Sequence, residues 1–220
     1  MIVAGFQKFS LTDFPGRVCS IIFTQGCNFR CPFCHNGELI PRRPTGRGSI
    51  PAGEVLRLLE SRKEMVDGVV ISGGEPTIQK GLAGIMERIR SIGCRIKLDT
   101  NGSRPEVLDR IIMDGLADYI AMDIKAPPEK YHLLAGREVQ VESILESMRM
   151  IAGSGIRHEF RTTRVTPLLS NADILEIKML LPEGSAHILQ RFNSVNSLDP
   201  ELRREPAAGA GMEQTGPELL

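Results

Sequence analysis

The chain of 220 residues carries 27 Lys and Arg against 27 Asp and Glu, and 41% of its residues are hydrophobic. This length fits one domain with a tail, and the balanced charge gives no global field that would attract nucleic acid or an anionic membrane. No run approaches the ~18 apolar residues of a membrane span and residues 1–8 do not resemble a signal peptide, so we expect a cytoplasmic protein without a membrane or nucleic-acid partner.

After a short edge segment at residues 8–16, which ends in a Pro-Gly turn, the hydrophobic pattern predicts strands that alternate with helices. The expected strands are residues 18–23, 68–72, 95–100, 119–124, 158–163 and 186–192. The expected helices cover residues 51–64 and the apolar stripes at 82–92, 107–112, 144–151 and 174–181. Such alternation is typical of parallel strands joined by right-handed crossovers.

The residues that suggest chemistry follow the carboxyl ends of the predicted strands: cysteines after the first, then SGGEP, DTNG and DIK segments after the next three. In α/β barrels the active site is built at this end of the strands, so we favour a barrel over a doubly wound open sheet. Six units fall short of the usual eight. The predicted fold is an α/β protein with an incomplete, open, six-stranded parallel β/α barrel over residues 1–198, followed by a low-complexity, disordered tail over residues 199–220.

Three of the five cysteines, Cys27, Cys31 and Cys34, form a tight CxxxCxxC cluster. An odd, clustered set of cysteines is a poor disulfide framework and indicates a metal site in a reducing compartment. Structural zinc would need a fourth protein ligand, and the adjacent His35 is poorly placed to reach the same ion as Cys34. A 4Fe–4S cluster with full protein ligation takes four cysteines, so a three-cysteine loop leaves one iron free for a small molecule.

Charged residues recur on one face of three predicted strands. By alternation, Arg95, Lys97 and Asp99 share a face of one strand, Asp123 and Lys125 a face of the next, and Glu159 and Arg161 a face of the third. The opposite, apolar faces fit the helical layer, so we expect the charges to point into the barrel and to pair with each other or with a charged ligand. The alternative is that they lie near exposed strand ends.

The cysteine motif with Phe33 before its last cysteine, together with Gly73-Gly74-Glu75-Pro76 after a strand, resembles the signature of the radical S-adenosylmethionine (radical SAM) enzymes. In that family the methionine amino and carboxylate groups of SAM bind the free iron of a 4Fe–4S cluster. Further segments resemble the glycyl-radical-enzyme activases, above all the activating proteins of anaerobic ribonucleoside-triphosphate reductase: Ser10–Gly16, Cys34–Asn36, Leu98–Gly102 and Asp123–Lys125.

The resemblance implies a set of site residues. Cys27, Cys31 and Cys34 would hold the cluster, and the SAM-binding set would be Phe33, Asn36, Gly73, Gly74, Glu75, Asp99, Thr100, Asp123, Lys125 and Arg161. Glu75 would meet the SAM amino group, and Asp99, Thr100 and Asp123 would help to hold a monovalent cation near the SAM carboxylate. The resemblance also implies a glycyl radical enzyme, such as anaerobic ribonucleotide reductase, as the partner, and a low-potential electron donor such as flavodoxin or ferredoxin.

Two other functions stay open at this point: a radical SAM enzyme that acts on a small molecule or nucleoside, and a non-catalytic zinc or iron–sulfur binding module. The Gly/Pro/Arg-rich residues 37–51 are either part of a docking surface or a solvated loop. Gln190–Phe192 either help to form the adenosine pocket or pack as an ordinary strand. Cys19 and Cys94 are expected to be small buried residues.

Overall fold

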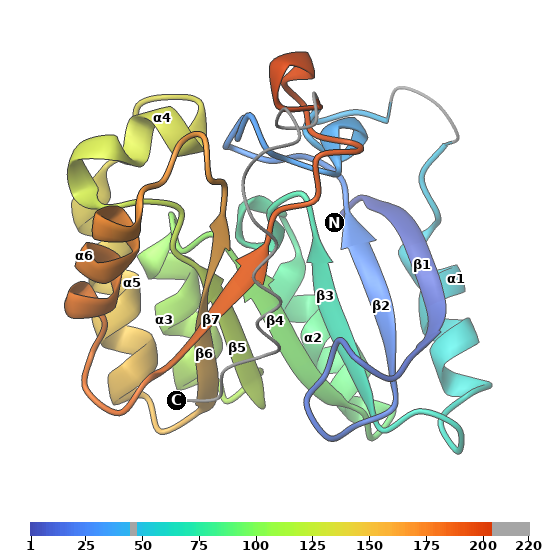
Figure 1. Ribbon diagram of the computed structural model, residues 1–220. Helices are drawn as coiled ribbons and strands as arrows, with labels where there is room; N and C mark the ends of the chain where they lie inside the picture. Colours follow the sequence, from blue (N-terminus) through green and yellow to red (C-terminus); the bar gives the residue numbers. More distant parts are fainter. Residues whose placement is uncertain (45–47, 204–220) are drawn as a thin grey trace.

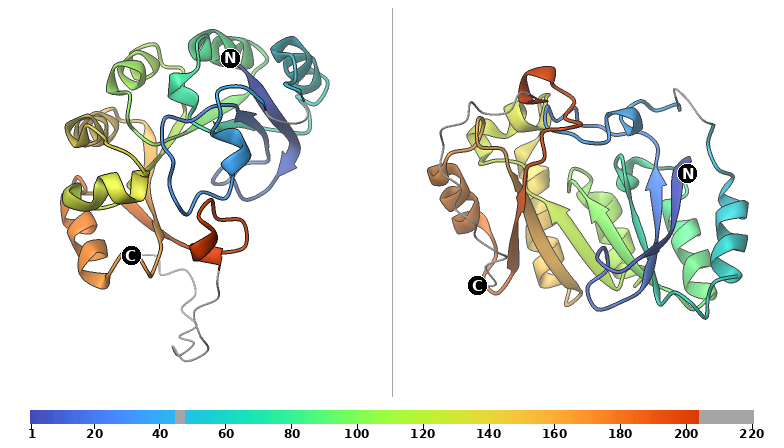
Figure 2. Two further views of the ribbon diagram at one scale, coloured as in Figure 1. Left: turned by 90° about the horizontal axis from the view of Figure 1, so that it is seen from above. Right: turned by 45° about the vertical axis from the view of Figure 1, so that its right-hand side comes forward.

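The computed structural model describes residues 1–44 and 48–203, which form a seven-stranded sheet of order β1-β2-β3-β4-β5-β6-β7 (Figure 1). Its strands are β1 (Val3–Ser10), β2 (Cys19–Thr24), β3 (Gly68–Gly73), β4 (Arg95–Thr100), β5 (Tyr119–Asp123), β6 (Arg157–Arg164) and β7 (Ala186–Arg191). β1 pairs antiparallel with β2, and all later pairs are parallel. Since β1 and β7 stand at the two ends of this order, the sheet curves without closing and the barrel is open between them (Figure 2).

The α-helices lie around the outer face of the curved sheet, and the loop that follows β2 lies inside the arc (Figure 2). They are α1 (Ala52–Glu60), α2 (Leu82–Ser91), α3 (Pro105–Met113), α4 (Tyr131–Ala135), α5 (Val141–Gly153) and α6 (Asn171–Leu180). The 3-10 helices are η1 (Gly37–Leu39), η2 (Pro76–Ile78), η3 (Pro128–Lys130) and η4 (Pro200–Arg203). Each parallel step from β2 to β7 therefore contains a helical crossover, as parallel pairing requires.

The six predicted strands and their parallel order are confirmed, and β4 coincides with the predicted range 95–100. The N-terminal edge segment differs from expectation, because β1 begins at Val3 and only its end overlaps residues 8–16. Residues 7–9 are consecutively exposed, so β1 lacks the alternation that marks a half-buried strand. The five-residue α4 was also missed, because so short a helix shows no helical period.

Alternation along the strands sorts the apolar residues into two layers. The outer layer packs against the helices and includes Ile22, Ile71, Ile96, Leu98, Ile120, Met122 and Phe160, each 0% exposed. A smaller cluster, formed by Phe14, Cys19, Ile21, Val70, Tyr119 and Ala121, is separate from it. The side chains of this second cluster lie on the other face of the strands, which lines the barrel interior. Polar residues occupy the interior at the carboxyl ends of the strands.

The segment Ser10–Gly16 closes the amino-terminal end of the barrel, at the opposite end from the cysteine loop (Figure 1). Phe14 is 0% exposed and meets the Tyr119 ring edge-on, with the centroids 6.1 Å apart. A Cβ at Gly68 would lie 2.8 Å from Cδ1 of Phe14, so this position has room for glycine but not for a side chain. This segment, which contributed to the family resemblance, therefore packs against the barrel interior at its amino-terminal end.

Two further predictions concern the cysteines outside the loop and the C-terminal tail. Cys19 and Cys94 are buried, as predicted. Of the predicted tail at residues 199–220, residues 199–203 are described and include η4, whereas residues 204–220 lie outside the described part, as do residues 45–47 of the predicted loop. No helix among the described residues has the length and apolar character needed to cross a membrane.

Candidate active site

The loop after β2, residues 25–36, carries the three cysteines and is held by backbone hydrogen bonds to two other segments. Cys31 is buried, whereas Cys27 and Cys34 are partly exposed. The anchoring bonds run from Gly26 N–H to Leu39 O (2.7 Å), from Cys27 N–H to Ile40 O (3.0 Å) and from Arg30 N–H to Ala135 O (2.8 Å). The residues around η1 and the end of α4 thus fix an irregular loop at the carboxyl end of the first parallel strand.

The chemistry of the three thiols fits a metal cluster. All are free, and burial raises the pKa of Cys27 to about 12 and that of Cys31 to about 11, and also raises the pKa of Cys34. Such thiols ionise only beside a strong positive charge, which bound metal supplies. Among the described residues no three His, Cys, Asp or Glu side chains are placed to share a single ion. A cubane takes each thiolate at a different iron, so this donor set fits a 4Fe–4S cluster.

The two glycines at the end of β3, Gly73 within the strand and Gly74 directly after it, let the chain pass close to the start of the cysteine loop. A Cβ at Gly74 would lie 2.1 Å from the carbonyl oxygen of Gly26, and one at Gly73, where φ is 110°, would lie 2.3 Å from the backbone nitrogen of Thr24. The amide of Glu75 also donates to Gly26 O at 2.8 Å. The predicted close backbone approach is present and is directed at the neighbouring loop. Contact of Gly73 and Gly74 with SAM stays a prediction.

Glu75 is a buried carboxylate that joins two loops. It is 1% exposed, and it accepts the Thr77 amide (3.0 Å) and hydroxyl (2.6 Å), the Thr100 hydroxyl (2.7 Å) and the Asn101 amide (2.7 Å). Burial raises the pKa of Glu75, and the donors around it oppose that shift. Glu75 and Thr100 thereby fix the loops after β3 and β4 relative to each other. The expected contact of Glu75 with the SAM amino group stays a prediction.

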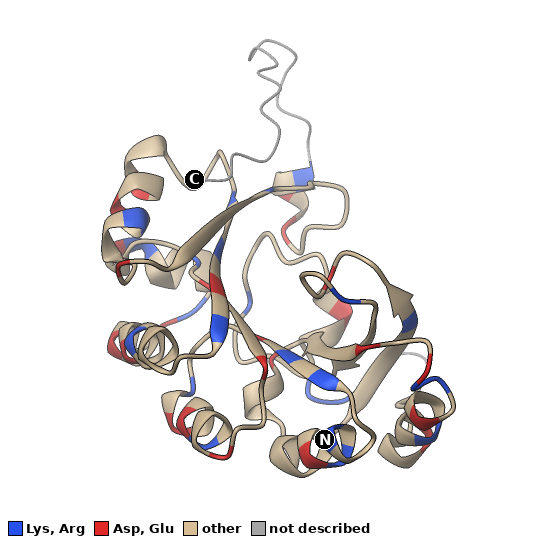
Figure 3. Cartoon of the chain, turned by 90° about the horizontal axis from the view of Figure 1, so that it is seen from below, with Lys and Arg blue, Asp and Glu red and all other residues tan. Residues whose placement is uncertain are grey.

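The interior charges of β4, β5 and β6 form a chain of ion pairs, which we call the charged network: Lys97, Asp99, Arg161, Asp123 and Lys125. Lys97 Nζ lies 2.5 Å from Asp99 Oδ1, and Arg161 Nη1 lies 3.4 Å from Asp99 Oδ2. Arg161 Nε and Lys125 Nζ each lie 2.9 Å from Asp123, on different oxygens. Figure 3 shows both acidic and basic positions on the strands that surround the barrel interior. The charges of the network thus pair with one another, which was one of the two outcomes expected, and pairing with a charged ligand stays a prediction.

The charged network is stable as ions because its members compensate one another. Burial alone would raise the pKa of Asp123, but Arg161 and Lys125 hold it well below its usual range. Burial alone would lower the pKa of Lys125 and of Arg161, but nearby carboxylates, Asp123 foremost, raise both. Removing one partner of such a buried set leaves an uncompensated charge.

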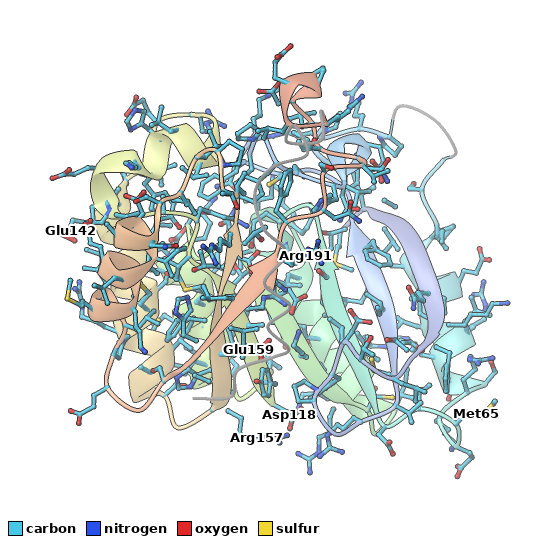
Figure 4. The ribbon with its side chains drawn as sticks, viewed as in Figure 1. Met65, Asp118, Glu142, Arg157, Glu159 and Arg191 are labelled. Carbon is cyan, nitrogen blue, oxygen red and sulfur yellow. The ribbon has the colours of Figure 1, made fainter. Side chains whose placement is uncertain are left out.

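Two other charged residues lie nearer the amino end of the barrel. Glu159 accepts the Tyr119 hydroxyl at 2.9 Å, beneath the charged network. Arg95 was expected to face the interior, and this is wrong: its side chain is 56% exposed and pairs with Asp118 at 2.7 Å. Figure 4 places Asp118 and Arg157 at this end, with Glu159 above them. Arg95 is the first residue of β4, so for this residue the alternative interpretation, that the charge lies at an exposed strand end, is correct.

Lys125 connects the charged network to the cysteine loop. Its Nζ lies 5.8 Å from the ring centroid of Phe33, which is 5% exposed. Asn36, two residues after Cys34, is exposed, and its carbonyl accepts the amide of Leu39 in η1. Phe33 is thus packed between the loop and the charges, whereas a role for Asn36 in SAM binding stays a prediction.

The segment after β7 folds back beside the cysteine loop, which the sequence did not reveal (Figure 1). The His35 ring stacks on Phe192, with centroids 5.8 Å apart, and hydrogen-bonds to the carbonyl of Asn193. The amide of Asp199 donates to Pro32 O at 2.8 Å. Phe192 is the last residue of the predicted final strand. The contacts of Asn193 and Asp199 use main-chain atoms, which every residue carries, so no sequence signal could identify these two contacts.

The side chains proposed for a monovalent cation are already engaged. Asp99 and Asp123 place each carboxylate oxygen against a protein cation, and Asp99 Oδ2 also accepts the Ser72 hydroxyl at 3.1 Å. The Thr100 hydroxyl donates to Glu75 instead of facing these carboxylates. This arrangement does not fit the cation site implied by the resemblance.

The barrel is open and parallel, and its three-cysteine loop and charged interior lie at the same end. These features define the class of the protein as an iron–sulfur enzyme that binds a charged ligand in its barrel. Residues 21–181 match the Radical SAM superfamily, and the chain belongs to that family. The family implies SAM and a 4Fe–4S cluster as the cofactors of this enzyme.

Among curated relatives, a protein of Methanocaldococcus jannaschii provisionally named a glycyl-radical enzyme activating enzyme is 30% identical over 93% of this chain and 85% of its own. The pyruvate formate-lyase-activating enzyme of Streptococcus mutans is 26% identical over 71% of this chain and 64% of its own. A 7-carboxy-7-deazaguanine synthase of Methanopyrus kandleri is 31% identical over 52% of each chain. The chain thus spans most of the first relative and about half of the third.

Solved structures confirm the fold. SuiB of Streptococcus suis, bound to its precursor peptide SuiA, has a TM-score of 0.60 and 19% identity over 80% of this chain and 39% of its own. The coproporphyrinogen III oxidase HemN of Escherichia coli, described as a radical SAM enzyme, has a TM-score of 0.59 and 17% identity over 90% of this chain and 49% of its own. The chain therefore corresponds to less than half of each of these proteins.

Proposed function

We propose that this radical SAM enzyme is a glycyl-radical-enzyme activase. The observation that carries the proposal is the convergence of the cysteine loop, the Glu75-bonded loops and the charged network at the carboxyl end of a barrel that stays open between β1 and β7. A polypeptide loop of a partner protein needs such an open side, whereas a small molecule could enter a closed barrel. The name of the M. jannaschii relative, matched over 93% of this chain, supports the same function.

In this proposal each part of the site has a separate task. Cys27, Cys31 and Cys34 hold the 4Fe–4S cluster. When bound, the cluster and SAM would supply the radical chemistry, namely one-electron reductive cleavage of SAM and removal of a hydrogen atom from a glycine Cα of the partner. Binding and orientation of SAM fall to Phe33, Asn36, Gly73, Gly74, Glu75, Asp99, Thr100, Asp123, Lys125 and Arg161.

The chain's own residues orient SAM and exclude water. Lys125 and Arg161 present cationic groups suited to the SAM carboxylate, and Asp123 holds both in place. Phe33, a buried residue of the cysteine loop, packs its ring against the Lys125 ammonium. Such preorganised contacts fix the ligand before the reaction and need no rearrangement during it.

The proposal extends to the partners. Anaerobic ribonucleotide reductase is the proposed target, on the resemblance of residues 34–36 and 98–102 to its activating proteins, and flavodoxin or ferredoxin is the proposed electron donor. The clustered free cysteines suit a reducing compartment, so the cytoplasm is the proposed location.

The test begins with anaerobic reconstitution by iron and sulfide. The reconstituted protein should form 5′-deoxyadenosine from SAM and a reductant, and it should produce an organic radical signal on a candidate anaerobic reductase in electron paramagnetic resonance spectra. Turnover of SAM without a radical on the partner contradicts the activase proposal. Colourless protein that binds one zinc and leaves SAM intact contradicts enzyme function as a whole and favours the metal-binding module.

A second candidate is a radical SAM enzyme for a small molecule or nucleoside. The synthase of M. kandleri favours it, because the match covers 52% of this chain at 31% identity. The two candidates differ in their substrate, so formation of 5′-deoxyadenosine in the absence of any partner protein, stimulated by a small molecule or nucleoside that is consumed in proportion, would support this second function.

A further inference from the structure

Lys97 is the most deeply buried cation of the charged network, and the family resemblance did not assign it a role. Its side chain is 3% exposed, its Nζ lies 2.5 Å from Asp99 Oδ1, and it stands 6.0 Å above the Tyr119 ring. Lys97 and Asp99 are two positions apart on β4, so strand alternation places both side chains on the same face. The ammonium is thereby held between the Asp99 carboxylate and the Tyr119 ring.

The Lys97 ammonium contacts Asp99, one of the two carboxylates that the resemblance assigns to a monovalent cation. An alkali ion here would take carboxylate oxygens of Asp99 and Asp123, but Lys97, Arg161 and Lys125 already contact those oxygens. The charged network already holds three cations, Lys97, Arg161 and Lys125, against the two carboxylates of Asp99 and Asp123. A further monovalent ion would therefore add a buried, uncompensated charge and would have to displace a protein cation.

We propose that the Lys97 ammonium, bonded to Asp99, is a built-in substitute for a monovalent metal ion, so that SAM binding by this protein is independent of Na⁺ and K⁺. Lys97 acts through Asp99 and Arg161 and is a positioning residue: its ion pair holds the Asp99 carboxylate in place, and Asp99 in turn orients Arg161 toward the ligand. The inference rests on the proposed SAM site, but not on the identity of the partner protein.

The first experiment uses the reconstituted wild-type protein. SAM affinity is measured anaerobically by calorimetry, and 5′-deoxyadenosine formation in parallel, while KCl or NaCl replaces choline chloride at constant ionic strength. Both quantities should change by no more than about twofold. A tenfold or larger gain in affinity with either metal ion, about 1.4 kcal/mol, would overturn the inference. A wild-type protein that binds no SAM under any condition would instead contradict the proposed function.

Variants separate this role from a purely structural one. In Lys97→Ala the Asp99 carboxylate loses one of its two cationic partners and its Oδ1 becomes free, so SAM affinity should fall about tenfold or more in choline chloride and recover when K⁺ or ammonium is added. Lys97→Arg, which keeps a cation, should remain insensitive to K⁺. The matched control is Arg95→Ala on the same strand, whose partner Asp118 lies outside the network, and it should bind SAM like the wild type.

The recovery of SAM affinity on addition of K⁺ or ammonium to Lys97→Ala is the measurement that tests the inference. A Lys97→Ala protein whose SAM affinity stays low in every salt, while its circular dichroism matches the wild type, would show that the ammonium is not acting as an ion substitute. Unchanged affinity of Lys97→Ala in choline chloride would also overturn the inference. If Lys97→Ala does not fold, the salt series on the wild type and on Lys97→Arg still tests it.

Discussion

Glu75 Oε2 accepts the backbone amide of Asn101 at 2.7 Å, so the carboxylate that follows β3 is bonded to the loop that follows β4. The same carboxylate accepts the hydroxyls of Thr77 and Thr100 through Oε1. A residue that sequence motifs connect with ligand binding is therefore also a structural link between two of the loops that build the site. Replacing Glu75 therefore tests its structural role in the protein without the cofactors.

Glu75→Gln should destabilise the protein by about 1–3 kcal/mol, because an amide keeps one acceptor oxygen and turns a donor toward buried N–H or O–H groups. Urea denaturation of the apoprotein measures the change. Glu106→Gln is the control: that side chain is 58% exposed and pairs with Arg104 at the surface, so its loss should change stability by no more than about 0.5 kcal/mol. Equal urea midpoints for Glu75→Gln and wild type would contradict the buried role described above.

Gly74→Ala should disturb the cysteine loop, because its Cβ would lie 2.1 Å from the Gly26 carbonyl oxygen. We expect a destabilisation of at least ~1–3 kcal/mol and a lower iron content after reconstitution. Gly84→Ala in α2 is the matched control, since a Cβ there meets nothing within 4 Å. That change should stabilise the protein by roughly 0.5–1 kcal/mol. If both alanine variants load iron equally well, the close approach at Gly74 is not required for the loop.

Cys31→Ala should abolish the cluster and SAM cleavage together, because Cys31 is one of three thiols available in the loop. Iron and sulfide analysis, visible absorption and 5′-deoxyadenosine formation measure the loss. Cys94→Ala removes a buried thiol of the outer core and should leave all three readouts at wild-type levels. Retention of SAM cleavage by Cys31→Ala would contradict the assignment of the cluster to this loop.

Asp118 should make stability depend on pH in the acid range. Burial alone would raise its pKa, but the Ile96 amide and the guanidiniums of Arg95 and Arg90 hold it below the usual value. A lowered folded-state pKa means that the stabilisation is present above the unfolded pKa of about 3.9 and is lost as the pH falls toward the folded value.

Stability measured by urea between neutral and acid pH checks this sign. The free-energy difference between wild type and Asp118→Asn should be largest near neutrality and should shrink once the pH falls below about 3.9. A difference that stays constant through the acid range would contradict the assignment. The experiment is independent of cofactor chemistry, because Asp118 lies at the amino end of the barrel (Figure 4).

The sequence alone determined the parallel β/α order, the cysteine loop and the strand face on which most of the interior charges lie. These depend on local patterns: the period of two that puts Lys97 and Asp99 on one face of β4, and cysteine spacing that a loop can satisfy by itself. Arg95 shows the limit of that argument, because the same period placed it inside, whereas its position at the start of the strand exposes it.

The tertiary structure decided which groups meet across the barrel. Arg161 bridges Asp99 and Asp123, which come from two different strands, and Asn193 reaches His35 from the far end of the chain through a main-chain carbonyl. No local pattern encodes such contacts, because they depend on how the sheet curves and on atoms that all residues share. The same curvature brings protein cations onto both carboxylates, which is the observation behind our proposal that a protein ammonium takes the place of a monovalent metal ion.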